Sequence, residues 1–171
     1  NILIENSEIV KAEGGSKAAA IGNKFWAATN IVIKNSTLGD IFGGNASAAI
    51  GGSRYDGESK HNISIEIENS TITNAVGGQA GAGIGSGYDT HCNQQEYSAT
   101  NNIIIKNSTI KAKGGKYAPG IGAGYHSAYL TGSIDAESTI DSEAGDDVWY
   151  KSTYTRAQNL GYGVMDPARE F

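Results

Sequence analysis

The chain has 171 residues, enough for one domain with a buried core, and its 24 glycines and 2 prolines form neither a collagen repeat nor a proline-rich linker. A net charge of −5, with no basic stretch, argues against binding to nucleic acid or to an anionic membrane. No apolar run is long enough to insert into a membrane, and the single cysteine, Cys92, excludes an internal disulfide.

A short pattern of alternating isoleucines followed by a polar turn recurs along the chain. It is found at residues 1–9, 30–38, 65–72 and 102–110, with a degenerate copy at 134–140. The alternation has a period of two, which predicts a β-strand before each turn with its isoleucines pointing inward. A second predicted strand begins three residues after each turn asparagine, at Ile9, Leu38, Ile72 and Ile110.

A glycine pair and a short small-residue strand follow each of the first four copies. The pairs are 14–15, 43–44, 77–78 and 114–115, and the strands end in Ile-Gly at 21–22, 50–51, 84–85 and 121–122, with Leu160-Gly161 completing the series. From the turn asparagine to the pair the step is 8, 8, 8 and 7 residues, and from the second glycine to the isoleucine it is always 6. From that isoleucine to the next turn asparagine the step is 14, 19 and 23 residues. The spacing predicts a three-sided solenoid with one variable loop per coil.

The turn position is occupied by asparagine, followed by serine, in four copies: Asn6, Asn35, Asn69 and Asn107. Asparagine tolerates the left-handed backbone region, and stacked asparagines can form hydrogen bonds between coils. This arrangement resembles the asparagine ladder of the pectate-lyase-like β-helix superfamily over residues 1 to about 140. The Gly-Ile-Gly style resembles repeat regions of secreted, carbohydrate-associated proteins of gut bacteria. The resemblance implies an all-β, right-handed parallel β-helix of about five coils.

We expect a single β-helix domain over residues 1–165, as a fragment of a larger protein, and a tail or cap over 166–171. In the fifth copy Glu137 or Ser138 replaces the turn asparagine, so the regular stack is expected to end there. The resemblance implies a secreted or cell-surface bacterial protein, although one cysteine fits a cytosolic protein equally well.

The third predicted strand carries almost no side chains beside its inward isoleucine. Gly83 and Gly85 flank Ile84, and alanine or glycine occupies most of the equivalent positions in the other coils. If these residues point outward, they form a flat surface on which a ligand, or another domain of the parent protein, could lie.

Aromatic side chains fall four or five residues after each of the first four isoleucines. Together with neighbouring polar residues they give a candidate ligand-binding set: Trp26, Arg54, Tyr55, Tyr88, Tyr125 and His126. Aromatic rings suit the apolar faces of sugars, and the polar groups suit sugar hydroxyls. An alternative role for the same aromatics is to shield the edge of the sheet, and the two roles can coexist.

A candidate catalytic set lies in the same loops. Asp56 and Asp89 fall six and five residues after their isoleucines, so they are expected on adjacent coils, and His91 is a candidate proton carrier with His126. Glycosidases use two carboxyl groups about 5–5.5 Å or about 6.5–9.5 Å apart. Asp146 and Asp147 could fold over the same edge. A polysaccharide lyase would need Arg54 as its basic residue, beside calcium-binding acids.

Three other motifs are explained better by the repeat than by chemistry. The glycine-rich run 81–87 is one copy of a ladder with no helix expected after it, which disfavours a phosphate loop. The Asn-x-Ser/Thr sites at the turns have a backbone explanation that competes with glycosylation. The threonines Thr37, Thr71 and Thr109 form a single column, whereas ice binding requires a wide paired array.

Three functions remain open from sequence. The first is a glycan-binding or adhesive domain for oligosaccharides, polysaccharides or glycoprotein glycans, with the ligand on the Ala/Gly strand beside the aromatic loops. The second is a glycoside hydrolase, or less favourably a polysaccharide lyase, that uses Asp56 and Asp89. The third is a structural stalk. No cofactor is expected, and calcium is the one metal considered.

Overall fold

The computed structural model describes residues 1–23, 28–54, 62–88, 100–125, 129–145 and 160–162. Within these ranges every regular element is a β-strand, and the strands form three sheets of five parallel strands each. No helix long and apolar enough to cross a membrane occurs in the described part of the chain.

The first sheet contains the strands that precede the asparagine turns. Its order is β1 (Ile2–Glu5), β4 (Thr29–Lys34), β7 (Asn62–Glu68), β10 (Thr100–Lys106) and β13 (Tyr129–Ile134). Ile31 pairs with Ile65, which pairs with Ile103, so equivalent residues stack from coil to coil. Ile31 and Ile65 are fully buried, as the period-two alternation predicts.

The second sheet contains the strands that follow the turns. Its order is β2 (Glu8–Glu13), β5 (Thr37–Phe42), β8 (Thr71–Val76), β11 (Thr109–Lys113) and β14 (Thr139–Glu143). The register shifts between Ile110 and Ala112, which pair with Ile72 and Ala75. Strand β8 therefore carries one extra residue at a β-bulge, which explains why the step to the glycine pair shortens from 8 to 7.

The third sheet is the narrowest. Its strands are β3 (Ile21–Gly22), β6 (Ile50–Gly51), β9 (Ile84–Gly85), β12 (Ile121–Ala123) and β15 (Leu160–Tyr162), paired in that order. The isoleucines of these strands complete a core that also contains the inward residues of the other two sheets.

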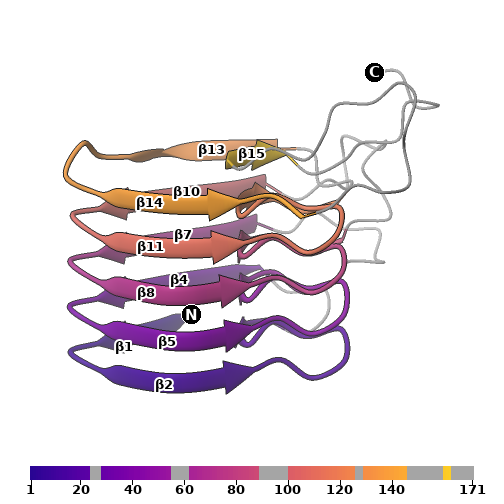
Figure 1. Ribbon diagram of the computed structural model, residues 1–171, viewed down its shortest axis with the longest axis horizontal. Helices are drawn as coiled ribbons and strands as arrows, with labels where there is room; N and C mark the ends of the chain where they lie inside the picture. The colour runs from indigo at the N-terminus through magenta and orange to yellow at the C-terminus, as the bar shows by residue number, and fades with distance from the viewer. Residues whose placement is uncertain (24–27, 55–61, 89–99, 126–128, 146–159, 163–171) are drawn as a thin grey trace.

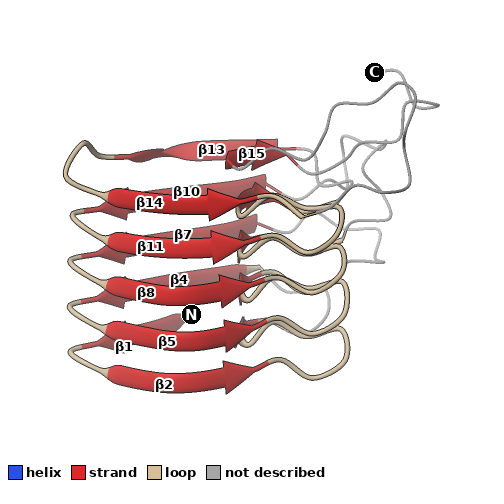
Figure 2. Cartoon of the chain, in the orientation of Figure 1, coloured by secondary structure: helices blue, strands red, loops and turns tan. Residues whose placement is uncertain are grey.

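The chain passes through the three sheets in turn, and each strand pairs in parallel with the equivalent strand of the previous coil, so the fold is a parallel β-helix. Figure 1 shows the coils rising right-handedly from β2 at the bottom to β14 near the top. Figure 2 shows the same strands joined by tan turns that repeat at both ends of the second sheet. The predicted three-sided solenoid of about five coils is confirmed.

The predicted left-handed turn is also confirmed. The backbone φ is 49° at Asn6, Asn35 and Asn69, and 44° at Asn107. Asn107 Nδ2 donates to Asn69 Oδ1 over 2.8 Å, which is one step of the expected asparagine ladder.

The expectation that the regular stack ends at the fifth turn is wrong. Thr139 of β14 pairs with Thr109, and Leu160 of β15 pairs with Ile121, so the fifth coil keeps the register of the fourth. Backbone hydrogen bonds in all three sheets hold this coil on the stack, although its turn has no asparagine.

Candidate functional site

The Ala/Gly strand is not an open surface, and this part of the sequence prediction is wrong. In the second, third and fourth coils the residues beside the inward isoleucine are buried, including Ala49, Gly83 and Gly85. A Cβ added at Gly83 would lie 2.6 Å from the Gly120 carbonyl oxygen and 2.7 Å from that of Ala75. Gly83 therefore faces the neighbouring backbone, and no ligand can lie on it.

The glycine after each isoleucine has a conformational cause. Gly85 has a φ of 139°, and a Cβ there would lie 1.7 Å from the carbonyl oxygen of Gly122. Gly51 has the same conformation, with a φ of 130°. An L-residue rarely adopts this backbone, so the glycine column is required by close packing of the coils.

The residues that do gather at the variable side form a cluster that we call the tyrosine corner: Arg54, Lys116, Tyr117, Tyr88 and Tyr125. Arg54, Tyr88 and Tyr125 each lie four residues after the isoleucine of their coil, just beyond β6, β9 and β12. All five side chains are partly buried. The spacing of four seen in the sequence therefore brings side chains of three successive coils together.

The rings of this cluster pack on one another. Tyr88 and Tyr125 are stacked, with ring centroids 5.4 Å apart and planes 13° from parallel. The Arg54 guanidinium carbon lies 5.3 Å from the centroid of the Tyr88 ring. Tyr88 therefore has a ring contact from the coil above and a cationic contact from the coil below.

Tyr117 enters the cluster from a different loop, the turn after the fourth glycine pair. Its ring lies 5.3 Å from that of Tyr125 at an angle of 44°, and Lys116 Nζ lies 5.2 Å from the Tyr117 centroid. Sequence analysis did not select Tyr117, because the other coils have no aromatic residue at that position.

Backbone amides of the cluster donate hydrogen bonds to the glycine turns. The Tyr88 amide donates to the Ala46 carbonyl over 2.9 Å, and the Tyr125 amide donates to that of Ala80 over 3.0 Å. Within its own coil, the Arg54 amide donates to Ser47 Oγ over 3.3 Å. These contacts hold the start of each of the three variable loops against a glycine turn, which belongs to the coil below for Tyr88 and Tyr125 and to the same coil for Arg54.

Most of the predicted site residues lie outside the described residues: Trp26, Tyr55, Asp56, Asp89, His91, His126, Asp146, Asp147 and the tail 166–171. The acid pair and the proton carriers therefore stay predictions. In the described ranges, no group of three or more His, Cys, Asp or Glu side chains is placed to hold a metal ion.

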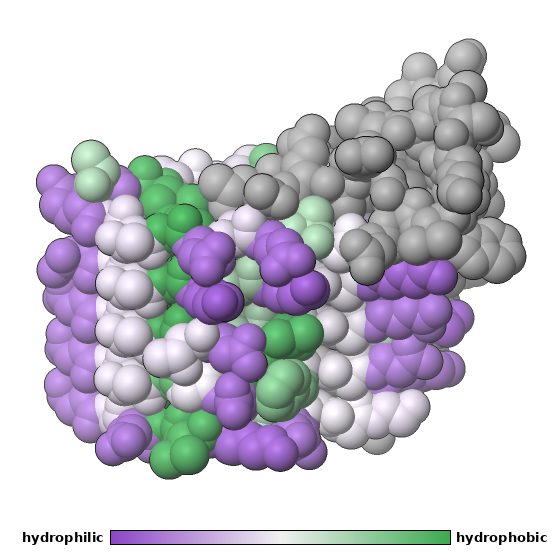
Figure 3. Space-filling model, in the orientation of Figure 1, coloured by the Kyte–Doolittle hydropathy of each residue, from purple (hydrophilic) through white to green (hydrophobic). Residues whose placement is uncertain are grey.

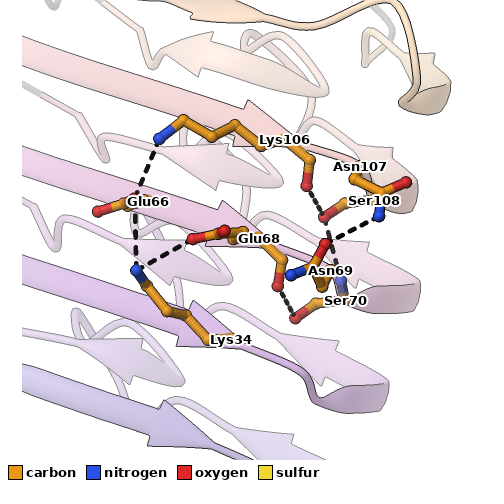
Figure 4. A network of polar contacts seen from close by, with 8 residues as sticks. All are labelled: Lys34, Glu66, Glu68, Asn69, Ser70, Lys106, Asn107 and Ser108. Carbon is orange, nitrogen blue, oxygen red and sulfur yellow. Dashed lines mark hydrogen bonds and ion pairs between the residues drawn. The ribbon is translucent and has the colours of Figure 1, made fainter.

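The corner between the first and second sheets is built from a serine ladder that sequence analysis did not predict. The Ser36 amide donates to Ser70 Oγ, and the Ser70 amide donates to Ser108 Oγ, both over 3.1 Å. Each serine hydroxyl donates in turn to the carbonyl two residues earlier, for example Ser70 to Glu68 over 2.8 Å. Figure 4 shows this ladder beside the asparagines Asn69 and Asn107, and we call the whole set the Asn-Ser corner.

Ion pairs lie on the first sheet beside the Asn-Ser corner (Figure 4). Lys34 contacts Glu68 at 3.0 Å and Glu66 at 3.6 Å, and Lys106 contacts Glu66 at 3.3 Å. The hydrogen bond with Glu68 and the charge of Glu66 raise the pKa of Lys34 above its ordinary value. These pairs are solvent-accessible and contribute little to stability individually.

The outer face of the second sheet carries the predicted threonine column. Thr37, Thr71, Thr109 and Thr139 stand in register on adjacent strands. Figure 3 shows pale side chains beside purple, hydrophilic ones on this face. Charged residues such as Lys111 and Asp141, which form an ion pair at 3.6 Å, lie farther along the same strands. This face is therefore not an array of paired threonines.

Comparison with known families agrees with this architecture. Residues 65–88 and 103–125 match the family model described as a beta helix repeat. Each matched segment begins on the first sheet and ends at a residue of the tyrosine corner, Tyr88 or Tyr125. No curated protein and no solved structure matches the chain significantly.

Proposed function

We propose that this β-helix repeat domain is a non-catalytic glycan-binding domain of a secreted or cell-surface bacterial protein, with the tyrosine corner as its binding edge. The observation that carries the proposal is the cluster of three tyrosines and two cations at the base of the variable loops. Half-buried aromatic side chains with polar tips are typical of recognition surfaces because they give contact area at a low entropic cost.

The packing of the rings restricts how a sugar can bind. Tyr88 is contacted by Arg54 and by Tyr125, at 5.3 Å and 5.4 Å between centres, so its two faces are already used. A glycan would therefore contact ring edges and the tyrosine hydroxyls, which both donate and accept hydrogen bonds. The guanidinium of Arg54 adds donors beside them. Such a site depends on hydrogen bonds more than on stacking.

A second candidate function, a structural stalk, is favoured by the same contacts. If the tyrosine corner serves only to cover the end of the third sheet, its rings have no need of a ligand. The two functions differ in what the loss of one ring does: a binding edge loses affinity, whereas a stalk loses only stability.

A glycan array measured with the whole chain and two variants tests the proposal. Tyr88→Ala removes a ring of the tyrosine corner. Phe42→Ala removes a comparable ring on the second sheet, where Lys11 Nζ lies 5.9 Å from the Phe42 centroid. We expect the parent chain to bind and Tyr88→Ala to weaken binding at least about fivefold, near the roughly 1 kcal/mol typical of a contributing interface residue.

The Phe42→Ala variant should bind like the parent chain, because its ring lies away from the tyrosine corner. Absence of binding by the parent chain would contradict the proposal. Equal binding by the parent chain and Tyr88→Ala would place the ligand elsewhere, which would also overturn the tyrosine corner as the binding edge.

A further inference from the structure

The fifth coil is packed less tightly than the coils beneath it. Gly132 of β13 pairs with Ile103, where the column below contains isoleucines. A cavity of about 330 Å³ opens at this point, between Ile103, Ile121, Leu130 and Ile134. Ile134 is 38% exposed, whereas its register partner Ile105 is fully buried. The last coil therefore contributes less buried apolar area than an inner coil.

The turn of the fifth coil is also attached differently. In the lower coils the turn asparagine donates its amide hydrogen to a backbone carbonyl of the coil above, as Asn69 does to Lys106 over 3.1 Å. Asn107 donates instead to the carboxylate Oδ2 of Asp135 over 2.8 Å. The other oxygen of that carboxylate accepts the hydroxyl of Ser138 over 2.5 Å. Among the described asparagine turns, the amide of Asn107 is therefore the one that donates to a titratable side chain and not to a backbone carbonyl.

The hydrogen bonds to Asp135 favour its ionised form. The hydrogen bond from Ser138 lowers the pKa of Asp135 most, helped by the Asn107 amide and by the charge of Lys106 on β10. Glu137, in the same turn, is the other titratable group close in sequence. A lowered pKa in the folded state stabilises the coil above the ordinary aspartate value, and this stability is lost as the pH falls through the folded value.

We propose that the fifth coil opens in acid ahead of the rest of the solenoid, with the Asp135 carboxylate as the latch between its turn and Asn107. Protonation removes the negative charge of the carboxylate that accepts hydrogen bonds from the Asn107 amide and the Ser138 hydroxyl. Few apolar contacts oppose the release, because Gly132 adds no side chain to the column that Ile65 and Ile103 form below it and a cavity lies beside it. Opening separates β13 and β14 from β10 and β11 and uncovers the edges of those two strands.

Amide hydrogen exchange of the whole chain tests this proposal. Exchange rates of Asn107 and Asn69 are measured at about pH 7 and about pH 3, each corrected for its intrinsic rate, because the ordinary aspartate pKa lies between these conditions. Asn69 is the control, since its acceptor is the Lys106 carbonyl, which does not titrate. We expect acid to raise the corrected rate at Asn107 severalfold relative to Asn69.

Two variants separate the latch from general acid effects. Asp135→Asn should raise Asn107 exchange at neutral pH and remove its extra acid sensitivity, whereas Glu137→Gln should behave like the parent chain. Equal loss of protection at Asn107 and Asn69 in acid would show that the fifth coil does not open separately and would overturn the proposal. An acid response unchanged in Asp135→Asn would overturn the role of the carboxylate.

Discussion

Two of the three corners of each coil, the Asn-Ser corner and the tyrosine corner, differ in how their residues vary. At the Asn-Ser corner the same two residue types recur in four coils, and their side chains bond to one another and to nearby backbone. At the tyrosine corner the equivalent position is Arg54 in the second coil and tyrosine, Tyr88 and Tyr125, in the third and fourth, so the residue type differs between coils while the backbone position does not. Repetition marks what the stack itself requires, and under the proposed function the variable position on the constant backbone is the one that contacts the ligand.

The repeated glycines and serines make contacts between coils that require these residue types. Gly85 and Ser70 are each required by a contact between coils: a Cβ at Gly85 would overlap the Gly122 carbonyl, and Ser70 Oγ accepts the Ser36 amide over 3.1 Å. The tyrosines make contacts of ordinary length that other side chains can replace. Substitution should therefore be more costly to folding at Gly85 than at the tyrosine corner.

The largest effect is expected at Gly85, which belongs to the repeated part although it lies only three residues before Tyr88. Gly85→Ala places a Cβ against the Gly122 carbonyl at a φ of 139° and should lower the free energy of unfolding by about 3 kcal/mol or more. Gly15→Ala is the matched control, because a Cβ there has no neighbour within 4 Å. Urea denaturation measures both, and equal stability of the two variants would contradict the packing explanation for the glycine column.

A smaller effect is expected in the serine ladder. Ser70 is 4% exposed, and Ser70→Ala leaves the buried Ser36 amide without its acceptor, which should cost about 1–3 kcal/mol. Thr109→Ala, on the exposed threonine column, should change stability by less than about 0.5 kcal/mol. If the two variants unfold at the same urea concentration, the ladder does not stabilise the stack.

The turn asparagine should show the smallest effect of the three. Asn69→Ala forces a Cβ-bearing residue without a polar side chain into a φ of 49° and should cost about 1 kcal/mol. Asn69→Gly tests the cause, because glycine adopts this conformation freely but cannot accept the hydrogen bond from Asn107. Recovery of stability in the glycine variant would assign the cost to conformation, and no recovery would assign it to the asparagine ladder.

Much of the fold could be predicted from the sequence because equivalent residues of successive coils recur at regular spacing in a solenoid. The isoleucine alternation gave the strands, the constant step of 6 residues located the third sheet, and the asparagines marked the left-handed turns. The bulge in β8 is visible in the sequence as a step of 8 residues, against 7 in the next coil, from the turn asparagine to the glycine pair. Only the strand register shows that the extra residue forms a bulge.

The site was harder to predict because side-chain direction is not encoded by spacing alone. Alternation suggested that Gly83 and Gly85 face outward, but two-residue strands with positive φ do not follow the pleat of longer ones. The spacing of four residues did identify Tyr88 and Tyr125, whereas Tyr117 comes from a loop in which no other coil has an aromatic residue. The carboxylate of Asp135 accepts the Asn107 amide, a contact that no repeat in the sequence indicates, whereas Ser138 continues the serine ladder by accepting the Ser108 amide.

The measurement that tests this account most directly records stability and glycan binding for Ser70→Ala and Tyr88→Ala in parallel. We predict that Ser70→Ala unfolds at a lower urea concentration and, when folded, binds like the parent chain. Tyr88→Ala should lose the roughly 0.5–1.5 kcal/mol of its aromatic pair in addition to the buried area of its ring, while its binding weakens. The opposite pattern, with Tyr88→Ala destabilised as much as Ser70→Ala and binding unchanged, would show that both corners serve only the fold.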